Sequence, residues 1–328
     1  MNFFCGGITD NSTMHLAEQG KVALLALKYR LRKFGRIPIS MGTEMFNTCI
    51  TPILLYCSQV WGYRNTYVLD KVFLGYLKQM LGVRITTSNC ATYSETRVLP
   101  FSVSCQYNMV KYWIKLVNGD RARPDFKSFF FLKENIDANV KGNWAKEVKS
   151  VLDNCGLSYL WNYDHIDNVT AVLGLIHQRL QDQMQTQIMS DVCHSAKLYS
   201  FSQFKIVFGQ EKYLHCILNF KHRQALSCMR LVSHDLEIEV GRRSSIPRHE
   251  RICKLCSNGI EDEQHFLLVC DKLAQVRLQY LPLFYINNSS HYNYCKLMRT
   301  DDEEILRNLC KYTYYAQKER ESILKNRI

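Results

Sequence analysis

The sequence is long enough for one large domain or two ordinary ones, and its composition excludes a disordered or low-complexity chain. Of its 328 residues, 47% are apolar and 12% are aromatic, while only 15 Gly and 6 Pro disfavour collagen-like and turn-rich β-sandwich structures. The net charge of +12 is uneven, because the first 150 residues hold 20 basic against 10 acidic side chains and the rest hold 22 against 20. A basic first half favours a polyanionic partner, RNA or DNA.

The first 18 residues have no helical pattern. Met1–Ile8 predicts one short strand without a partner strand, so residues 1–18 are expected to be the remnant of a preceding domain. No basic stretch precedes an apolar one here, which argues against a secretory signal. We therefore expect an intracellular protein of the nucleus or cytoplasm, whose 14 cysteines are reduced and mostly buried rather than joined in disulfides.

The pattern of residues 19–36 predicts a basic helix. One arc of its helical wheel is apolar and contains Ala23, Leu24, Leu27, Leu31 and Phe34. A separate arc carries four cations, Lys21, Lys28, Arg32 and Arg36. No acid lies between residues 19 and 42, so these charges repel one another unless an external anion neutralises them. The arc is a candidate phosphate-binding face, and the alternative is an ordinary solvated face.

Three more helices are expected at about residues 43–61, 67–81 and 102–117, which makes residues 19–118 a helical bundle. Residues 45–63 carry no charge and approach the length of a membrane span, but Asn47, Thr51 and Gln59 favour a buried helix, so no membrane partner is expected. A polar break at residues 120–125 predicts a boundary. Residues 119–194 are then a helical linker, and residues 195–328 a module that ends in a long helix.

The strongest chemical signal is the quartet Cys253, Cys256, His265 and Cys270, spaced C-x2-C-x8-H-x4-C. Two thiolates three residues apart can reach one ion from a tight turn, and the His and the third Cys add two more ligands. Three sulfurs and one imidazole suit structural Zn²⁺ and leave no open position for catalysis. Chance produces the whole pattern on the order of once in a hundred such sequences. The alternative is a set of buried free cysteines beside a surface His.

A second basic stretch surrounds the start of this quartet. It contains Arg242, Arg243, Arg248, Arg251 and Lys254, with only Glu250 between them. It is either a phosphate-contacting loop or a solubilising rim. No P-loop, nucleophile elbow, zinc-protease or dinucleotide motif is present, and no paired carboxylates suit a two-metal polymerase site. The acids at residues 301–304 only begin a helix. We therefore expect no catalytic activity.

Several phrases, in order, resemble the C-terminal region of non-LTR (LINE-type) retrotransposon reverse-transcriptase proteins. They are Lys28–Pro38, Phe46–Gly62 with its Pro-Ile-Leu-Leu-Tyr and Val-Trp-Gly runs, Leu77–Glu95, Leu99-Pro100, Lys111-Tyr-Trp113 and the Cys/His quartet. The resemblance implies a mainly α fold, with a helical thumb-like bundle followed by a small zinc-knuckle module that grips RNA or DNA. The palm carboxylates of the family have no counterpart, so polymerase activity is not implied.

The function expected from these observations is sequence-tolerant nucleic-acid binding by a fragment that lacks the polymerase palm and the endonuclease. Two alternatives remain, a zinc-stabilised protein-interaction adaptor and an expressed relic without function. Salt separates the first two, because phosphate binding weakens steeply with salt and apolar docking does not.

Overall fold

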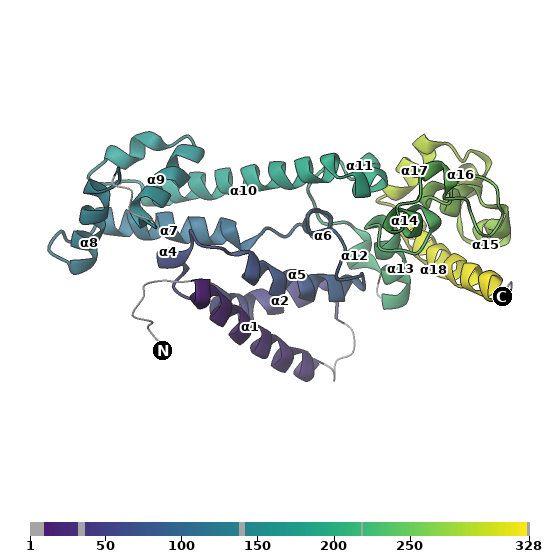
Figure 1. Ribbon diagram of the computed structural model, residues 1–328, viewed down its shortest axis with the longest axis horizontal. Helices are drawn as coiled ribbons and strands as arrows, with labels where there is room; N and C mark the ends of the chain where they lie inside the picture. Colours follow the sequence, from purple (N-terminus) through teal and green to yellow (C-terminus); the bar gives the residue numbers. More distant parts are fainter. Residues whose placement is uncertain (1–9, 32–36, 138–141, 218, 327–328) are drawn as a thin grey trace. The chain divides into compact units, whose positions relative to one another are not determined.

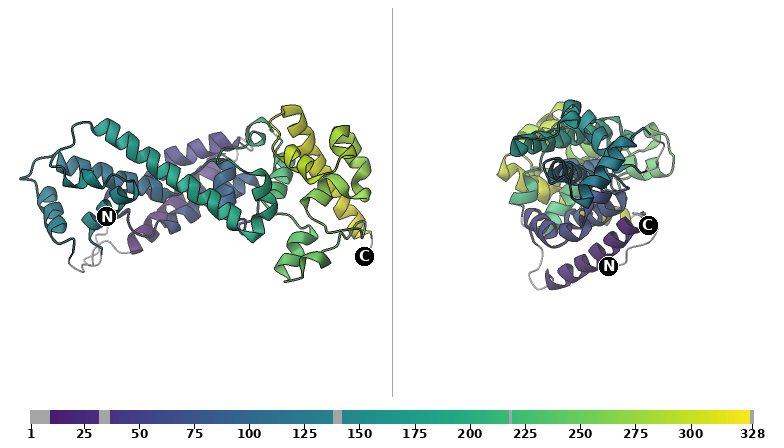
Figure 2. Two further views of the ribbon diagram at one scale, coloured as in Figure 1. Left: turned by 90° about the horizontal axis from the view of Figure 1, so that it is seen from above. Right: turned by 90° about the vertical axis from the view of Figure 1, so that its left-hand side faces the viewer.

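The computed structural model describes residues 10–31, 37–137, 142–217 and 219–326, and Figures 1 and 2 show it from three sides. Every regular element in these ranges is helical, and their only extended pairing is an isolated antiparallel bridge between Ile252 and Ile260. The expected mainly α class is therefore confirmed. No disulfide links the cysteines within these ranges, and none of the helices described is long and apolar enough to cross a membrane.

The chain divides into two compact units, each built from separate segments. Of the described residues, the first unit takes 10–31, 44–73, 98–137 and 142–187, and the second takes the remainder. The structure thus groups residues differently from the boundaries expected at 118 and 194. Three helices contribute residues to both units: α2 (Ile39–Cys49), α5 (Tyr67–Leu81) and α10 (Val169–His194).

The first unit also contains α1 (Asp10–Leu31), α3 (Thr51–Leu54), α4 (Ser58–Trp61), α7 (Phe101–Val117), α8 (Pro124–Glu134), α9 (Trp144–Asn154) and the short η2 (Ser158–Asn162). Helix α1 begins nine residues before the expected start, and its buried side continues back through Leu16 to Thr13. At Gly20 it lies so close to α3 that an added Cβ would be 2.4 Å from Leu54 Cδ2. Residues 10–18 are thus part of a packed helix, and the strand expected at residues 1–8 lies outside the described residues.

The charge-free stretch at residues 45–63 contains the end of α2 followed by α3 and α4, rather than the single helix expected at about residues 43–61. Pro52 occupies the first turn of α3, where a missing backbone N–H costs nothing. Cys57, between α3 and α4, has a left-handed φ of 56° that no helix can continue through. Phe46, Leu54 and Trp61 are nonetheless buried, so the stretch belongs to a core as expected.

Aromatic side chains join α7, α8, α9 and η2 in one core. Trp113 of α7 stacks on Trp161 of η2 with ring centroids 5.9 Å apart. Phe129 of α8 makes T-shaped contacts with the rings of Trp144 and Trp161. Burial of large aromatic rings supplies much of the stabilisation of such a core. The polar break at residues 120–125 is therefore a turn within one unit, because helices on both of its sides share this core.

The second unit is built around α13 (Phe220–Arg230) and α18 (Glu303–Lys325), which pack side by side (Figure 1). Its other elements are α6 (Asn89–Thr96), η3 (Ala196–Leu198), α11 (Tyr199–Phe204), α12 (Tyr213–Cys216), α14 (Glu237–Arg243), η4 (Arg248–Glu250), η5 (His265–Val269), η6 (Asp271–Leu273), α15 (Ala274–Tyr280), α16 (Leu283–Asn287) and α17 (His291–Met298). Leu226, Leu309 and Tyr312 are fully buried in its core.

A buried ionic cluster crosses this second core. Arg230 of α13 donates to Glu95 of α6, whose side chain is inaccessible to solvent, and to Glu211 at 2.8 Å. Lys205 also contacts Glu211. Loss of one partner would leave a buried charge uncompensated, which typically costs several kcal/mol, so this cluster fixes α6 against α13.

Candidate metal centre and basic surfaces

A tight reversal of the chain places Cys253 and Cys256 on the same side. The Ile252–Ile260 bridge closes it, the N–H of Cys253 donates to the carbonyl of Gly259 at 2.9 Å, and the N–H of Ser257 donates to that of Cys253 at 2.9 Å. Ser257 and Gly259 have left-handed φ values of 57° and 79°. Gly suits this conformation because it lacks a Cβ. The short spacing of the two cysteines is thus built into a turn.

His265 and Cys270 lie at the two ends of a single π-helical turn, η5. The N–H of Cys270 donates to the carbonyl of His265 at 2.8 Å, an i to i+5 bond that brings residues five apart to one side. The Asp262 carboxylate accepts from the N–H of His265 at 2.9 Å and begins the turn. Two residues outside the motif support it: the Tyr312 hydroxyl lies 2.9 Å from the carbonyl of Leu267, and Arg277 donates to the carbonyl of Cys270.

The four side chains converge on one point. Their ligand atoms all lie within 4.8 Å of one another, with 3.9 Å between the sulfurs of Cys253 and Cys270 and 3.3 Å between Cys256 Sγ and His265 Nε2. A tetrahedral ion with bonds of about 2.3 Å to sulfur requires sulfurs about 3.8 Å apart. Cys253, His265 and Cys270 are buried and Cys256 is half-buried. The group can therefore hold a metal ion whose four coordination positions are all occupied by protein side chains.

Hydrogen bonding between the sulfurs and burial shift the pKa values of the three thiols in different directions. Hydrogen bonding to Cys270, together with burial, raises the pKa of Cys253 to about 12. The same bond lowers the pKa of Cys270, whereas burial raises the pKa of Cys256. A metal ion holds its cysteine ligands as thiolates, so its binding displaces these protons.

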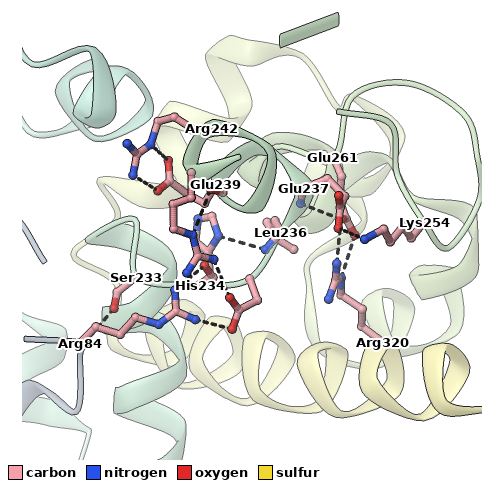
Figure 3. Close-up of polar contacts among 12 residues, drawn as sticks. Arg84, Ser233, His234, Leu236, Glu237, Glu239, Arg242, Lys254, Glu261 and Arg320 are labelled. Atoms are coloured by element: carbon pink, nitrogen blue, oxygen red, sulfur yellow. Dashed lines mark hydrogen bonds and ion pairs between the residues drawn. The ribbon is translucent and has the colours of Figure 1, made fainter. Parts of the chain in front are cut away.

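A buried carboxylate beside the quartet ties it to the last helix. Glu261 Oε1 lies 3.8 Å from the sulfur of Cys253, and both Glu261 oxygens accept bonds from Arg320 of α18 at 2.7 and 2.8 Å (Figure 3). The N–H of Glu237 also donates to this carboxylate. Sequence reasoning did not identify Glu261 or Arg320, because 59 residues separate them and neither belongs to the motif.

The basic stretch around the quartet has partners inside the chain. Four of its members pair with carboxylates: Arg242 with Glu239 at 2.8 Å, Arg243 with Asp235 at 2.8 Å, Arg248 with Asp262 at 3.4 Å and Lys254 with Glu237 at 2.7 Å. The fifth, Arg251, donates to the carbonyls of Ile238 and Ile246. Figure 3 labels both partners of the Arg242–Glu239 and Lys254–Glu237 pairs. Much of the positive charge expected here is therefore offset locally.

Three of these arginines, Arg242, Arg248 and Arg251, line a cavity of about 230 Å³ together with Tyr199, whose ring lies 5.5 Å from the Arg248 guanidinium. Glu239 and Asp262 line it too. The cavity is therefore of mixed charge.

The basic face expected on the first helix is described only in part. Lys21 pairs with Glu18 at 2.6 Å and has 53% of its side chain exposed. Lys28 is half-buried, and this burial lowers its pKa. Arg32 and Arg36 lie outside the described residues. The apolar side is largely as expected, since Leu24 is buried and Leu27 and Leu31 are partly buried.

No protein-family model, curated protein or solved structure matches this chain.

Proposed function

We propose that Cys253, Cys256, His265 and Cys270 bind one structural Zn²⁺. The observation that carries this proposal is the convergence of three sulfurs and one imidazole nitrogen within 4.8 Å. Zn²⁺ favours this donor set and a tetrahedral arrangement, and a site with four protein ligands has no position for substrate. The ion would join the Cys253–Cys256 turn to the His265–Cys270 turn, and its contribution would be to folding rather than to chemistry.

The proposed role of the chain is sequence-tolerant binding of RNA or DNA, as an intracellular protein related to the C-terminal region of non-LTR retrotransposon reverse transcriptases. Support comes from the net charge of +12, the ordered phrases of the sequence, the helical fold and the Cys/His group. Basic proteins bind polyanions through release of counterions from the phosphate backbone.

The test is a salt series. The purified chain is mixed with fluorescein-labelled single-stranded RNA, single-stranded DNA or duplex DNA, and fluorescence anisotropy is measured from about 50 to 200 mM salt. We expect affinity to fall steeply with salt and to depend little on sequence. Absence of binding at the lowest salt for all three probes would refute nucleic-acid binding, and zinc content would be measured on the same preparation.

The internal pairing of Arg242, Arg243, Arg248 and Lys254 favours a second candidate, a zinc-stabilised protein-interaction adaptor. An adaptor would bind a protein partner with weak salt dependence and would not bind the three nucleic-acid probes. An expressed relic without function would do neither.

A further inference from the structure

A groove between α13 and α18 differs from the surfaces considered so far. It has a volume of about 360 Å³ and is lined chiefly by two lysines, two glutamine amides, one aromatic ring and one thiol: Lys221, Gln224, Cys228, Tyr314, Gln317 and Lys318. None of its lining residues within the described ranges carries a carboxylate. The groove thus combines positive charge, hydrogen-bonding amides and an aromatic wall.

The cations of this surface form no ion pair with carboxylates of the described residues. This holds for Lys221, for Lys318 and for Lys311, which lies seven residues before Lys318 on the same side of α18. The charge of Lys311 reaches His222, where burial and this lysine together lower the pKa of the imidazole. The pKa of Lys318 is raised chiefly by its hydrogen bond to the Tyr314 side chain, and the charge of Glu321 contributes less. These lysines contrast with the basic residues near the metal centre, which are paired.

Aromatic rings extend the groove along α18. Tyr314 packs against His222 at 5.1 Å and against the edge of Tyr315 at 5.2 Å, and Tyr315 stacks on Tyr280 at 5.6 Å. Lys318 Nζ lies 5.0 Å from the centre of the Tyr314 ring; Tyr314 is half-buried and Tyr315 is 42% exposed. Exposed rings beside lysines form a platform for unpaired bases, whose faces stack without sequence preference.

We propose that this groove is a binding site for single-stranded nucleic acid. Lys221, Lys311 and Lys318 contact phosphates, and a base stacks at Tyr314 and Tyr315. Duplexes bind less well, because their base faces are already stacked on one another. The inference rests on the proposed nucleic-acid function and assigns it to a surface that the sequence did not single out.

The test uses the full chain with U20 RNA and dT20 DNA, each labelled with fluorescein. Lys221→Gln/Lys318→Gln should reduce the log–log salt slope by about 1.4, at about 0.7 per phosphate on a single strand. Tyr314→Leu should weaken binding about ten-fold at fixed salt and leave the slope unchanged. The matched control is Lys127→Gln/Lys146→Gln, which removes two exposed lysines from α8 and α9 and should lose less than the groove variant. Circular dichroism and zinc content establish that each variant is folded.

A crosslinking experiment keeps the proposal falsifiable on the unmodified chain. A strand containing 5-iodouracil is irradiated in the complex, and the crosslinked peptides are mapped by mass spectrometry. Crosslinks at Tyr314, Tyr315 or His222 support the groove. The groove is not the binding site if the parent chain binds but all crosslinks lie elsewhere, or if both groove variants bind as the parent does. In either case the proposed nucleic-acid function stands. If the parent chain binds neither probe, both fail.

Discussion

Arg320 holds Glu261 through two hydrogen bonds of 2.7 and 2.8 Å, and in this way α18 is joined to the turn that carries Cys253. Burial would lower the pKa of Arg320, but the bonds and charge of Glu261 outweigh it and raise the pKa. Tyr312, two helical turns earlier, contacts the carbonyl of Leu267 in η5. The last helix therefore supports both halves of the candidate metal centre.

The first prediction concerns the metal. The purified chain should contain one Zn²⁺, and Cys256→Ser should lose it, because one of four ligands is removed. Hydrogen exchange should then increase at about residues 245–280. All four tryptophans, Trp61, Trp113, Trp144 and Trp161, belong to the first unit, so tryptophan fluorescence should remain parental. Stoichiometric zinc in this variant would refute the ligand assignment.

The second prediction concerns the contact between Arg320 and Glu261. Arg320→Met leaves a buried carboxylate without its arginine partner. The free energy of unfolding of the second unit should fall by about 3 kcal/mol, measured by hydrogen exchange in a urea series. Adding Glu261→Gln removes the unpaired charge and should recover part of this loss. A double variant that is as unstable as the sum of the two single variants would show that the two residues act independently.

The third prediction is a pH dependence. Burial alone would raise the pKa of Glu211, but the charges of Arg230 and Lys205 outweigh it, so the pKa lies below its ordinary value of 4.5. The folded state therefore binds this proton less readily than the unfolded state. The stabilisation is complete above the ordinary pKa and is lost as the pH falls through the lowered one.

Glu211→Gln should accordingly lower the free energy of unfolding of the second unit by about 2 kcal/mol near neutral pH. The parent loses stability as the pH falls from about 5 to 3, and the variant should lose less over this range. Glu319→Gln, which removes an exposed carboxylate of the same unit, should keep the parental decline. Identical acid profiles for Glu211→Gln and the parent would contradict the assignment.

The fourth prediction concerns the basic face of the first helix. If Lys21, Lys28, Arg32 and Arg36 contact phosphates, replacing all four with Gln should reduce the slope of log affinity against log salt concentration by about 3 to 4. Zinc content should not change. Gln has a helix propensity similar to those of Lys and Arg, so the fold should persist. Parental binding of RNA and duplex DNA at low salt would make this face an ordinary solvated surface.

The fifth prediction concerns activity. The chain should not extend a primer on an RNA or DNA template with Mg²⁺, because a two-metal mechanism requires carboxylates that clamp both ions and the sequence offers no such pair. The assay is incorporation of labelled nucleotide. Template-dependent extension that a point substitution in this chain abolishes would overturn the prediction.

Helical character and the Cys/His group could be predicted because both depend on short-range patterns. Leu69, Phe73 and Leu77 recur at helical spacing and are buried in α5, and the two halves of the quartet need only residues three and five apart. Element boundaries were less predictable. The start of α1 extends nine residues beyond its clear apolar pattern, and the left-handed Cys57 that divides residues 45–63 has no Gly or Asn to signal it.

The sequence by itself determined the composition of the second basic stretch, but only the tertiary structure decided what those charges contact. Asp235, Glu237 and Glu239 precede it in the chain, and folding brings each carboxylate to a basic side chain. The Arg230–Glu95 pair spans 135 residues, and the groove between α13 and α18 joins residues about ninety apart. Local spacing encodes a turn or a helix, whereas the net charge of a surface depends on which distant segments the core brings together.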